Sequence, residues 1–346
     1  MGVSTVPVVD GIPYARTGRD GLRRQVSELL ADGDTDAARV ALLADADDWW
    51  DAASPPPEQL ARVAEAATLR EAMSLLGMGR VADYFAHRWS DPSYLAGLAL
   101  LQQHWPHGRP VVEVACGTGH YLRELHRRGC TDLLGVDVVW AKLWLAQRFV
   151  CPQARYLCAD VVTSVLPAAA EASYVLCHDA FYFLPDKPAA AAALRSLAGP
   201  GGTVVVGHAH VADTVSSGLP LTARGYADVL GADGFPVQVV YDDDELTRAL
   251  LEGRPPRPQP TAELETSEAV ALVAGDPLRP APEDLGQPLG PLAPNPLYVD
   301  GQLTWPSARY GQEYGPRSTY LPARWPAELP ADAARRRMLL DLPAHW

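Results

Sequence analysis

The amino-acid sequence predicts an α/β fold with one doubly wound sheet of seven strands, an N-terminal helical segment and an irregular C-terminal arm. Between residue 109 and residue 275, short apolar runs alternate with helical segments, which is typical of a parallel sheet with crossover helices. Earlier residues carry apolar side chains at helical spacing. Eight prolines between 277 and 306 exclude long regular elements after the sheet.

The N-terminal part is predicted to be a flexible tail over residues 1–20 and a helical cap over residues 21–108. Apolar periodicity and proline stops define the helices of the cap. They are expected over residues 21–32, 35–51, 58–77 and 80–104. The last of these carries Tyr84, His87 and Trp89.

The sheet is predicted within residues 109–275. Its strands are expected, in order, in PVVEVAC, DLLGVDV, ARYLCAD, SYVLCHD, GGTVVVGHAHV, PVQVVYD and SEAVALVAG. Helices are expected over residues 119–129, 140–149, 187–198 and 221–232, and in DDELTRALLEG, where Asp caps the N-terminus.

The C-terminal extension, residues 276–346, is predicted to be ordered but mostly irregular. LYVDGQLTW reads as a hairpin around Asp300-Gly301. Five aromatic residues are too many for a disordered tail: Trp305, Tyr310, Tyr314, Tyr320 and Trp325. The extension is expected to pack on the core or at a homodimer interface, and the sequence leaves both open.

The amino-acid composition limits the classes of molecule that are expected as partners. The sequence has 29 Lys and Arg against 42 Asp and Glu, a formal net charge of −13. Such a surface repels phosphate backbones and anionic lipid, so neither nucleic acid nor membrane is an expected partner. The five cysteines lack CxxC spacing, and no apolar run approaches the ~20 residues of a membrane span. A cytoplasmic protein is expected.

The main chemical signal is VVEVACGTGHYL, residues 111–122. A buried strand runs into Cys116-Gly117-Thr118-Gly119, and a helix follows at once. Glycines allow a sharp turn and close approach of a ligand, and the helix N-terminus offers free N–H groups. Asp137 ends the second strand, where an acid binds ribose hydroxyls. Asp160 ends the third strand, where a carboxylate can accept an adenine amino proton, although such acids about as often cap the next helix.

On these residues, the sequence resembles the class I S-adenosylmethionine-dependent methyltransferases over about residues 109–275. The first motif matches at Glu113, Ala115, Cys116, Gly117, Thr118 and Gly119, with alanine at 115 where the family usually has glycine. Residues 173–186 and 199–206 match the fourth and fifth strands. The resemblance implies a Rossmann-like methyltransferase sheet, S-adenosylmethionine as cofactor and S-adenosylhomocysteine as product.

The same resemblance implies roles for single residues. Glu113 and the glycine loop would hold the methionine end, Asp137 with Val138 the ribose, and Asp160 with Val161 the adenine, while His178 would line the cofactor. The nearest rival, a dinucleotide-dependent oxidoreductase, would need glycine or alanine at the position of Leu122.

Catalytic candidates end the fourth and fifth strands. His178 and Asp179 either act in catalysis or serve as a cap and a cofactor contact. His208 and His210 lie two residues apart, so strand alternation sends both imidazoles to one side. This pair would bind a divalent metal, deprotonate the substrate or simply pack. A metal site needs a third ligand. The sequence does not place the candidates Asp213, His178 and Asp179 relative to this pair, so no metal is predicted.

The substrate side is expected to include Tyr84, His87 and Trp89, in a segment that commonly forms a lid in this family, and Tyr182. Packing is the ordinary role of such aromatic residues.

The sequence thus predicts a methyltransferase (EC 2.1.1) that acts on a small molecule, of specialised-metabolite or sugar type, by in-line displacement. The alternatives are aminocarboxypropyl transfer or cyclisation with the same cofactor, and a non-catalytic or NAD-binding protein.

Overall fold

The computed structural model describes residues 6–46, 53–164, 166, 173–212, 218–276 and 283–346. The chain forms two compact units. The first comprises residues 1–86, 113–166 and 343–346, and the second residues 87–112 and 167–342. These boundaries differ from the predicted ones at 108 and 275, because the N-terminal helices group with the glycine-rich motif and the C-terminal arm with the later strands.

A seven-stranded sheet has the order β5-β4-β3-β6-β7-β9-β8, which confirms the predicted doubly wound α/β fold. Its strands are β3 (Val111–Val114), β4 (Leu133–Asp137), β5 (Arg155–Cys158), β6 (Tyr174–His178), β7 (Thr203–His210), β8 (Val237–Asp242) and β9 (Ala269–Gly275). The pairs β4–β5 and β6–β7 are parallel, whereas β9 runs antiparallel to both β7 and β8. The sheet is therefore mostly parallel rather than wholly so.

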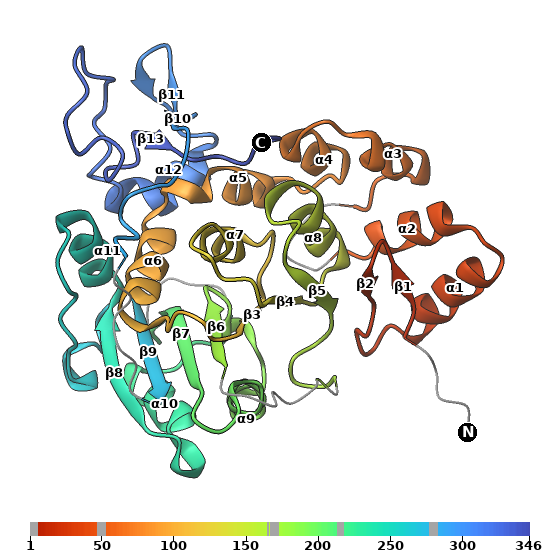
Figure 1. Cartoon of the computed structure of the whole chain (residues 1–346), viewed down its shortest axis with the longest axis horizontal. Coiled ribbons are helices and arrows are strands. Elements are labelled where there is room, and N and C mark those ends of the chain that lie inside the picture. The colour runs from red at the N-terminus through yellow and green to blue at the C-terminus, as the bar shows by residue number, and fades with distance from the viewer. Residues whose placement is uncertain (1–5, 47–52, 165, 167–172, 213–217, 277–282) are drawn as a thin grey trace. The chain divides into compact units, whose positions relative to one another are not determined.

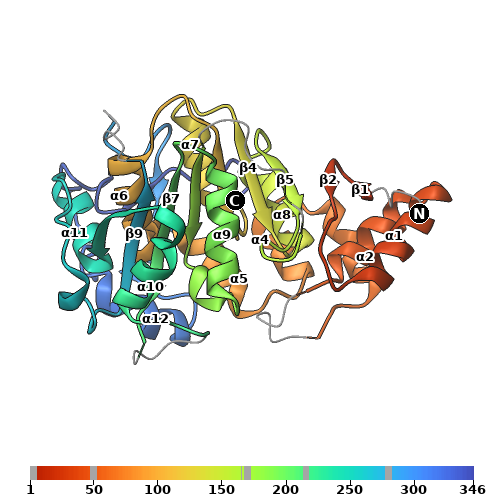
Figure 2. The same cartoon turned by 90° about the horizontal axis from the view of Figure 1, so that it is seen from below.

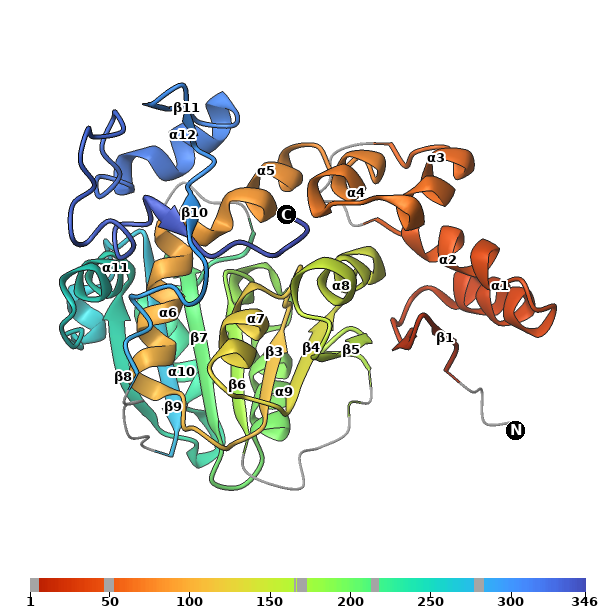
Figure 3. The same cartoon turned by 45° about the horizontal axis from the view of Figure 1, so that its top comes forward.

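In the first unit, two helices pack beside β4, as Figure 3 shows. They are α7 (His120–Arg127) and α8 (Trp140–Leu145), the latter continued by a π turn, η4 (Ala146–Val150). The unit also contains α1 (Asp20–Ala31), α2 (Thr35–Leu43), α3 (Pro57–Ala61), η2 (Arg62–Glu65), α4 (Leu69–Leu75) and most of α5 (Arg80–His87).

The expected flexible tail is wrong for residues 6–20. Strands β1 (Val8–Val9) and β2 (Ile12–Pro13) form a hairpin around Asp10-Gly11, both at positive φ. Tyr14 is fully buried and pairs with β5 through a bridge to Cys158. Two hydrogen bonds of 2.6 and 2.9 Å from the Arg39 guanidinium hold the Asp10 carboxylate. The sequence carried this signal, since Asp-Gly between apolar residues is a strong hairpin indicator.

Two expected helices are broken. The stretch 58–77 divides at Ala66 into η2 and α4, and Thr68 caps the new helix by accepting from the Glu71 N–H. The stretch 80–104 divides into α5, η3 (Arg88–Ser90) and α6 (Pro92–His104). Asp91 precedes proline, which disfavours helical geometry, and its side chain caps α6 instead. In the stretch 35–51, α2 ends at Leu43, and residues 47–51 lie outside the described residues.

In the second unit, α6 packs against α11 (Asp243–Glu252) and β7, as Figure 1 shows. Helices α9 (Lys187–Ala198) and α10 (Ala223–Leu230) lie next to each other (Figure 2), with α9 against β6 and β7 and α10 against β9. Shorter 3₁₀ turns complete this part: η5 (Phe181–Phe183), η6 (Ala232–Gly234) and η7 (Thr261–Glu263). None of the described helices is both long and apolar enough to cross a bilayer.

The described part of the C-terminal arm, residues 283–346, is ordered and mostly irregular. Its elements are β10 (Ala293–Pro294), β11 (Tyr298–Val299), β12 (Gln302–Leu303), α12 (Ala308–Tyr314), η8 (Gly315–Arg317) and β13 (Leu339–Leu340). Strands β11 and β12 form the expected hairpin, with Asp300 and Gly301 at positive φ. The hydroxyls of Tyr310 and Tyr320 donate to the carbonyls of His87 and Ser90.

Replacing Tyr14 by alanine tests whether the N-terminal hairpin contributes to stability. Loss of a fully buried ring should lower the free energy of unfolding by about 3–5 kcal/mol. Tyr14→Phe, which removes only the hydrogen bond to Asp45, should cost about 1 kcal/mol. Urea unfolding measures both. Val8→Ala, on the exposed side of the hairpin, is the control, and equal small effects for Tyr14 and Val8 would contradict a folded N-terminus.

His104 should make the protein sensitive to acid. It ends α6, shares a 3.0 Å hydrogen bond with Tyr241, and burial lowers its pKa to about 4 from 6.5. Because the unfolded chain takes up the proton first, the stability is complete above pH 6.5 and is lost as pH falls toward 4, by up to about 3 kcal/mol. His104→Gln should flatten this part of the curve of unfolding free energy against pH. A curve that His104→Gln leaves unchanged would contradict the lowered pKa.

Candidate functional site

The glycine-rich turn lies in the first unit, between β3 and α7. Ala115, Gly117 and Gly119 all have positive φ, of 56°, 54° and 78°. Gly119 is the N-cap of α7 and makes no side-chain cap hydrogen bond. Ala115 adopts the left-handed conformation despite its Cβ, so the alanine at this position is compatible with the turn. A helix N-terminus of this kind suits an anionic acceptor from outside the helix.

Asp137 is the residue that holds this turn. It ends β4, and its exposed fraction is 5%. One carboxylate oxygen accepts from the Gly117 N–H at 3.0 Å and the other from the Val139 N–H at 2.9 Å. Each oxygen has a further acceptor site, so the carboxylate can also accept from two hydroxyl groups of a ligand.

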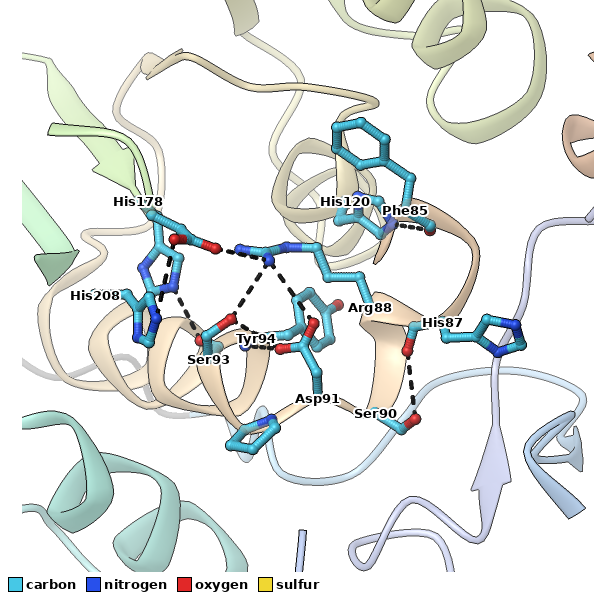
Figure 4. Close-up of polar contacts among 12 residues, drawn as sticks. Phe85, His87, Arg88, Ser90, Asp91, Ser93, Tyr94, His120, His178 and His208 are labelled. Atoms are coloured by element: carbon cyan, nitrogen blue, oxygen red, sulfur yellow. Dashed lines mark hydrogen bonds and ion pairs between the residues drawn. The ribbon is translucent and has the colours of Figure 1, made fainter. Parts of the chain in front are cut away.

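An aromatic side chain covers the turn. A Cβ added at Gly117 would lie 2.7 Å from Cε1 of Phe85, in α5, so only glycine fits beneath the ring. The Phe85 ring stacks on His120 at 6.1 Å, and the His120 Nε2–H donates to the Phe85 carbonyl, as Figure 4 shows. Nδ1 of His120 accepts from the Thr118 hydroxyl at 3.3 Å.

The other predicted cofactor residues also lie in the first unit. Asp160 caps the turn that follows β5, because Oδ1 accepts from the N–H groups of Val162 and Thr163. Glu113, Cys116 and Val161 are buried, and Val138 is half-buried. Burial raises the pKa of the Cys116 thiol well above its usual range, so this cysteine is not a reactive thiolate.

The second unit brings together three of the predicted catalytic residues. Asp179, His208 and His210 each offer one ligand atom, and these atoms lie within 4.8 Å of one another. Asp179 follows β6, and the two histidines end β7. His208 has a φ of 47° and lies at a β-bulge in the pairing with β9, a feature that often redirects side chains beside functional sites.

Hydrogen bonds fix the orientation of these three side chains. The Nδ1–H of His208 donates to Asp243 at 2.7 Å, and the Nδ1–H of His210 donates to the Glu268 carbonyl at 3.3 Å. The Tyr182 hydroxyl donates to Oδ1 of Asp179 at 2.9 Å. Both histidines therefore keep Nε2 for another partner.

Arg88 links this group to the start of α6. Its guanidinium lies 3.3 Å from Asp179 and 3.7 Å from Asp91, and it donates to the Ser93 hydroxyl at 3.4 Å. Figure 4 shows Arg88 directed toward Asp91 and Ser93. The side chains of Arg88, Asp91 and Asp243 are 5%, 0% and 3% exposed.

The buried charges shift one another's pKa values. Burial opposes protonation of His208, but Asp243 and Asp179 outweigh it and raise the His208 pKa. Burial favours the neutral form of Asp179 and Asp243, yet His208 lowers the pKa of each. Burial raises the pKa of Asp91 against the effect of Arg88, and burial and His208 lower that of His210.

His178 has a different environment. It is buried, its Nε2–H donates to the Ser93 carbonyl at 2.9 Å, and burial lowers its pKa to about 3. A Cβ at Gly207 would overlap its Nδ1, which explains glycine there. His178 therefore packs strand β6 on α6 and stands outside the group of three.

The predicted lid residues divide between the units. Tyr84 lies in the first unit, with its ring 5.1 Å from that of Phe85. His87 and Trp89 lie in the second, against Tyr310 and Tyr94 respectively. Asp213 lies outside the described residues.

Residues 111–202 match the profile of a family described as a methyltransferase domain. Over this segment the chain is similar to methyltransferase domains. The resemblance found in the sequence is thereby confirmed, and the matched segment includes the glycine-rich turn, Asp137 and Asp179.

Solved structures with similar folds include several methyltransferases, whereas no curated protein matches the chain. A TehB-like S-adenosylmethionine-dependent methyltransferase of Corynebacterium glutamicum is 18% identical, with a TM-score of 0.37, over 53% of this chain and 86% of that one. Phosphoethanolamine N-methyltransferase 2 of Haemonchus contortus, in complex with S-adenosyl-L-methionine, is 15% identical, with a TM-score of 0.43, over 61% of this chain and 60% of that one. DesVI of Streptomyces venezuelae is 16% identical, with a TM-score of 0.39, over 56% of this chain and 95% of that one.

Sequence reasoning missed several residues of these two groups. Arg88, Asp91 and Asp243 surround the group of three, and Phe85 and His120 adjoin the glycine-rich turn. Asp243 carried a weak signal, because it begins DDELTRALLEG, where Asp was expected as a cap, whereas Asp91 lay within the helix expected over 80–104. No local pattern marked Arg88, since its partners lie elsewhere in the chain.

Gly117→Ala tests the contact with Phe85. The left-handed φ costs about 1–2 kcal/mol and the overlap with the ring about 1–3 kcal/mol of unfolding free energy. Gly129→Ala is the matched control, because Gly129 also has positive φ but open space around it. Denaturant unfolding should show the larger loss at 117, partly restored by Phe85→Ala in the double variant. Equal losses at 117 and 129 would exclude the steric part.

Proposed function

We propose that this protein transfers the methyl group of S-adenosylmethionine to a hydroxyl of a small-molecule acceptor. The observation that carries the proposal is the Asp137 carboxylate beside the glycine-rich turn, within a methyltransferase domain. Aminocarboxypropyl transfer and cyclisation would use the same cofactor residues, and the reaction product distinguishes them.

The residues of the first unit fit this cofactor. Asp137 retains an acceptor site on each oxygen, which suits the two ribose hydroxyls. The turn ends at Gly119, the N-cap of α7, and a helix N-terminus suits a carboxylate. We assign the methionine end to Glu113 and the turn (residues 115–119), the ribose to Asp137 with Val138, and the adenine to Asp160 with Val161.

Bound S-adenosylmethionine supplies an electrophilic methyl carbon on a sulfonium. The acceptor hydroxyl would receive this methyl group and release its proton to water, and the cofactor would leave as S-adenosylhomocysteine. The protein's contribution is mainly alignment, which can supply ~7–11 kcal/mol. Asp179, His208 and His210 are the polar groups that we assign to the acceptor.

The class of acceptor follows from charge and chemistry. A net charge of −13 disfavours nucleic acid as acceptor. A sugar or specialised metabolite with several hydroxyls suits a group of two imidazoles and a carboxylate. The five buried cysteines suit a reducing compartment such as the cytoplasm.

Binding of S-adenosylhomocysteine, followed by thermal unfolding, tests the cofactor assignment. At a hundredfold excess over Kd, the ligand should raise the free energy of unfolding by ~2.7 kcal/mol. Asp137→Asn should weaken binding about 10–100-fold, because a charge-assisted hydrogen bond is lost. Asp132→Ala, an exposed acid paired with Arg155, should leave binding unchanged.

NAD is the ligand control. A thermal shift with NAD and none with S-adenosylhomocysteine would overturn the methyltransferase proposal. Incubation with S-adenosylmethionine and candidate polyols should yield S-adenosylhomocysteine, and methylthioadenosine as the product instead would assign aminocarboxypropyl transfer.

A further inference from the structure

We infer that Asp179, His208 and His210 form a binding site for a first-row divalent cation, such as Zn²⁺, Fe²⁺ or Mn²⁺, which takes oxygen atoms of the acceptor as its remaining ligands. The cation site stands on the geometry of the second unit alone. Only the assignment of the acceptor as its further ligand rests on the proposed function.

The ligand atoms of the three side chains lie somewhat farther apart than they would around a bound ion. Their ligand atoms lie within 4.8 Å of one another, and Nε2 of His208 is 3.9 Å from Oδ1 of Asp179. Bonds of roughly 2.1 Å to a cation bring neighbouring ligand atoms to roughly 3.0–3.4 Å. The most widely separated pair must therefore approach by up to roughly 1.4–1.8 Å, which rotation of a half-buried side chain such as His210 allows.

The histidines are held in the form that binds metal. Each donates its Nδ1–H to an oxygen, His208 to the Asp243 carboxylate and His210 to the Glu268 carbonyl, so the lone pair lies on Nε2. A carboxylate or carbonyl behind the imidazole is the usual partner of a metal-bound histidine, since it orients the ring and raises its basicity. Two histidines with such partners, two residues apart, are hard to explain by packing alone.

Neighbouring side chains also orient the Asp179 carboxylate. Oδ1, the oxygen nearer His208, accepts from the Tyr182 hydroxyl. Oδ2 is the oxygen that contacts Arg88. Oδ1 is therefore the oxygen that lies toward the histidines, and it is the one that we assign to the cation.

The local charge favours a cation. Three carboxylates lie in this network, Asp179 and Asp91 beside Arg88 and Asp243 beside His208, against the two guanidinium groups of Arg88 and Arg317. The side chains of all five residues other than His208 are at most 13% exposed. Oδ1 of Asp243 accepts no hydrogen bond from any described residue, although it is buried.

The donor set selects the class of ion and of ligand. Two imidazoles and one carboxylate suit transition metals rather than Mg²⁺ or Ca²⁺, which prefer oxygen ligands. Three protein ligands leave two or three positions open on a five- or six-coordinate ion. A hydroxyl with a neighbouring oxygen can occupy two of them, and the cation would lower the pKa of that hydroxyl, so that its proton passes to water.

Titration of untagged, chelator-treated protein with Co²⁺ tests the cation site. Visible absorption should show one Co²⁺ per chain with nitrogen and oxygen ligands, and calorimetry should show one Zn²⁺ at the same site. His210→Gln should weaken binding about a hundredfold or more, and Asp243→Asn about tenfold, because Asp243 positions His208 without touching the ion. His107→Gln, at an exposed histidine near Glu283, is the control and should bind as the original protein does.

Acetohydroxamate, which binds metals through two oxygens, tests the open positions. It should alter the Co²⁺ spectrum of the original protein and have no effect in His210→Gln. A Co²⁺ spectrum that acetohydroxamate leaves unchanged would overturn the assignment of open positions to oxygen ligands.

Two results would overturn the cation site itself. The first is that the protein binds neither Co²⁺ nor Zn²⁺ although circular dichroism shows it to be folded. Asp243, His208 and Asp179 would then form a metal-free ion network. The other is metal binding that His210→Gln leaves unchanged. Binding of S-adenosylhomocysteine to the same samples separates the two proposals, because it depends on Asp137 and not on these residues.

Discussion

The two hydrogen bonds that the Asp137 carboxylate accepts determine the shape of the first unit's functional end. One fixes the Gly117 N–H and the other the Val139 N–H, so the turn after β3 and the end of β4 are joined through a single side chain. The left-handed residues of the turn can then start α7 directly, with Gly119 as its N-cap. The turn is also closely packed against β4, since a Cβ added at Gly135 would lie 2.8 Å from the Cys116 sulfur.

The second unit is organised by a buried network of charges rather than by a backbone turn. Asp91, Arg88, Asp179, His208 and Asp243 follow one another at ion-pair distance, from the start of α6 to the start of α11. Removing one member of such a network leaves its partner buried and uncompensated, which is strongly destabilising. The network therefore specifies how these elements meet, and it also directs Nε2 of His208 to the Asp179 carboxylate.

Local patterns predicted the strands and several helix ends well, because those depend on neighbouring residues. Helix α9 was expected over 187–198 and has these bounds, and the residues ending β4, β6 and β7 were identified. The reversed direction of β9 was not predicted, since strand order depends on contacts between distant segments. Nor could the sequence join Asp243 to His208, which are 35 residues apart and meet only through the β-bulge at His208.

The tyrosines of the C-terminal arm have a consequence for how the protein folds. Their hydroxyls bind carbonyls of His87 and Ser90, which lie 223 and 230 positions earlier in the chain. Contacts of such separation form late, because a long loop must close before they stabilise anything. At synthesis rates of roughly 5–20 residues per second, α6 leaves the ribosome roughly 10–45 s before these tyrosines do. During that interval the residues that lead into α6, an apolar helix buried at Pro92–Leu101 in the finished unit, lack these two hydrogen bonds, so this end of the helix reaches its final contacts last.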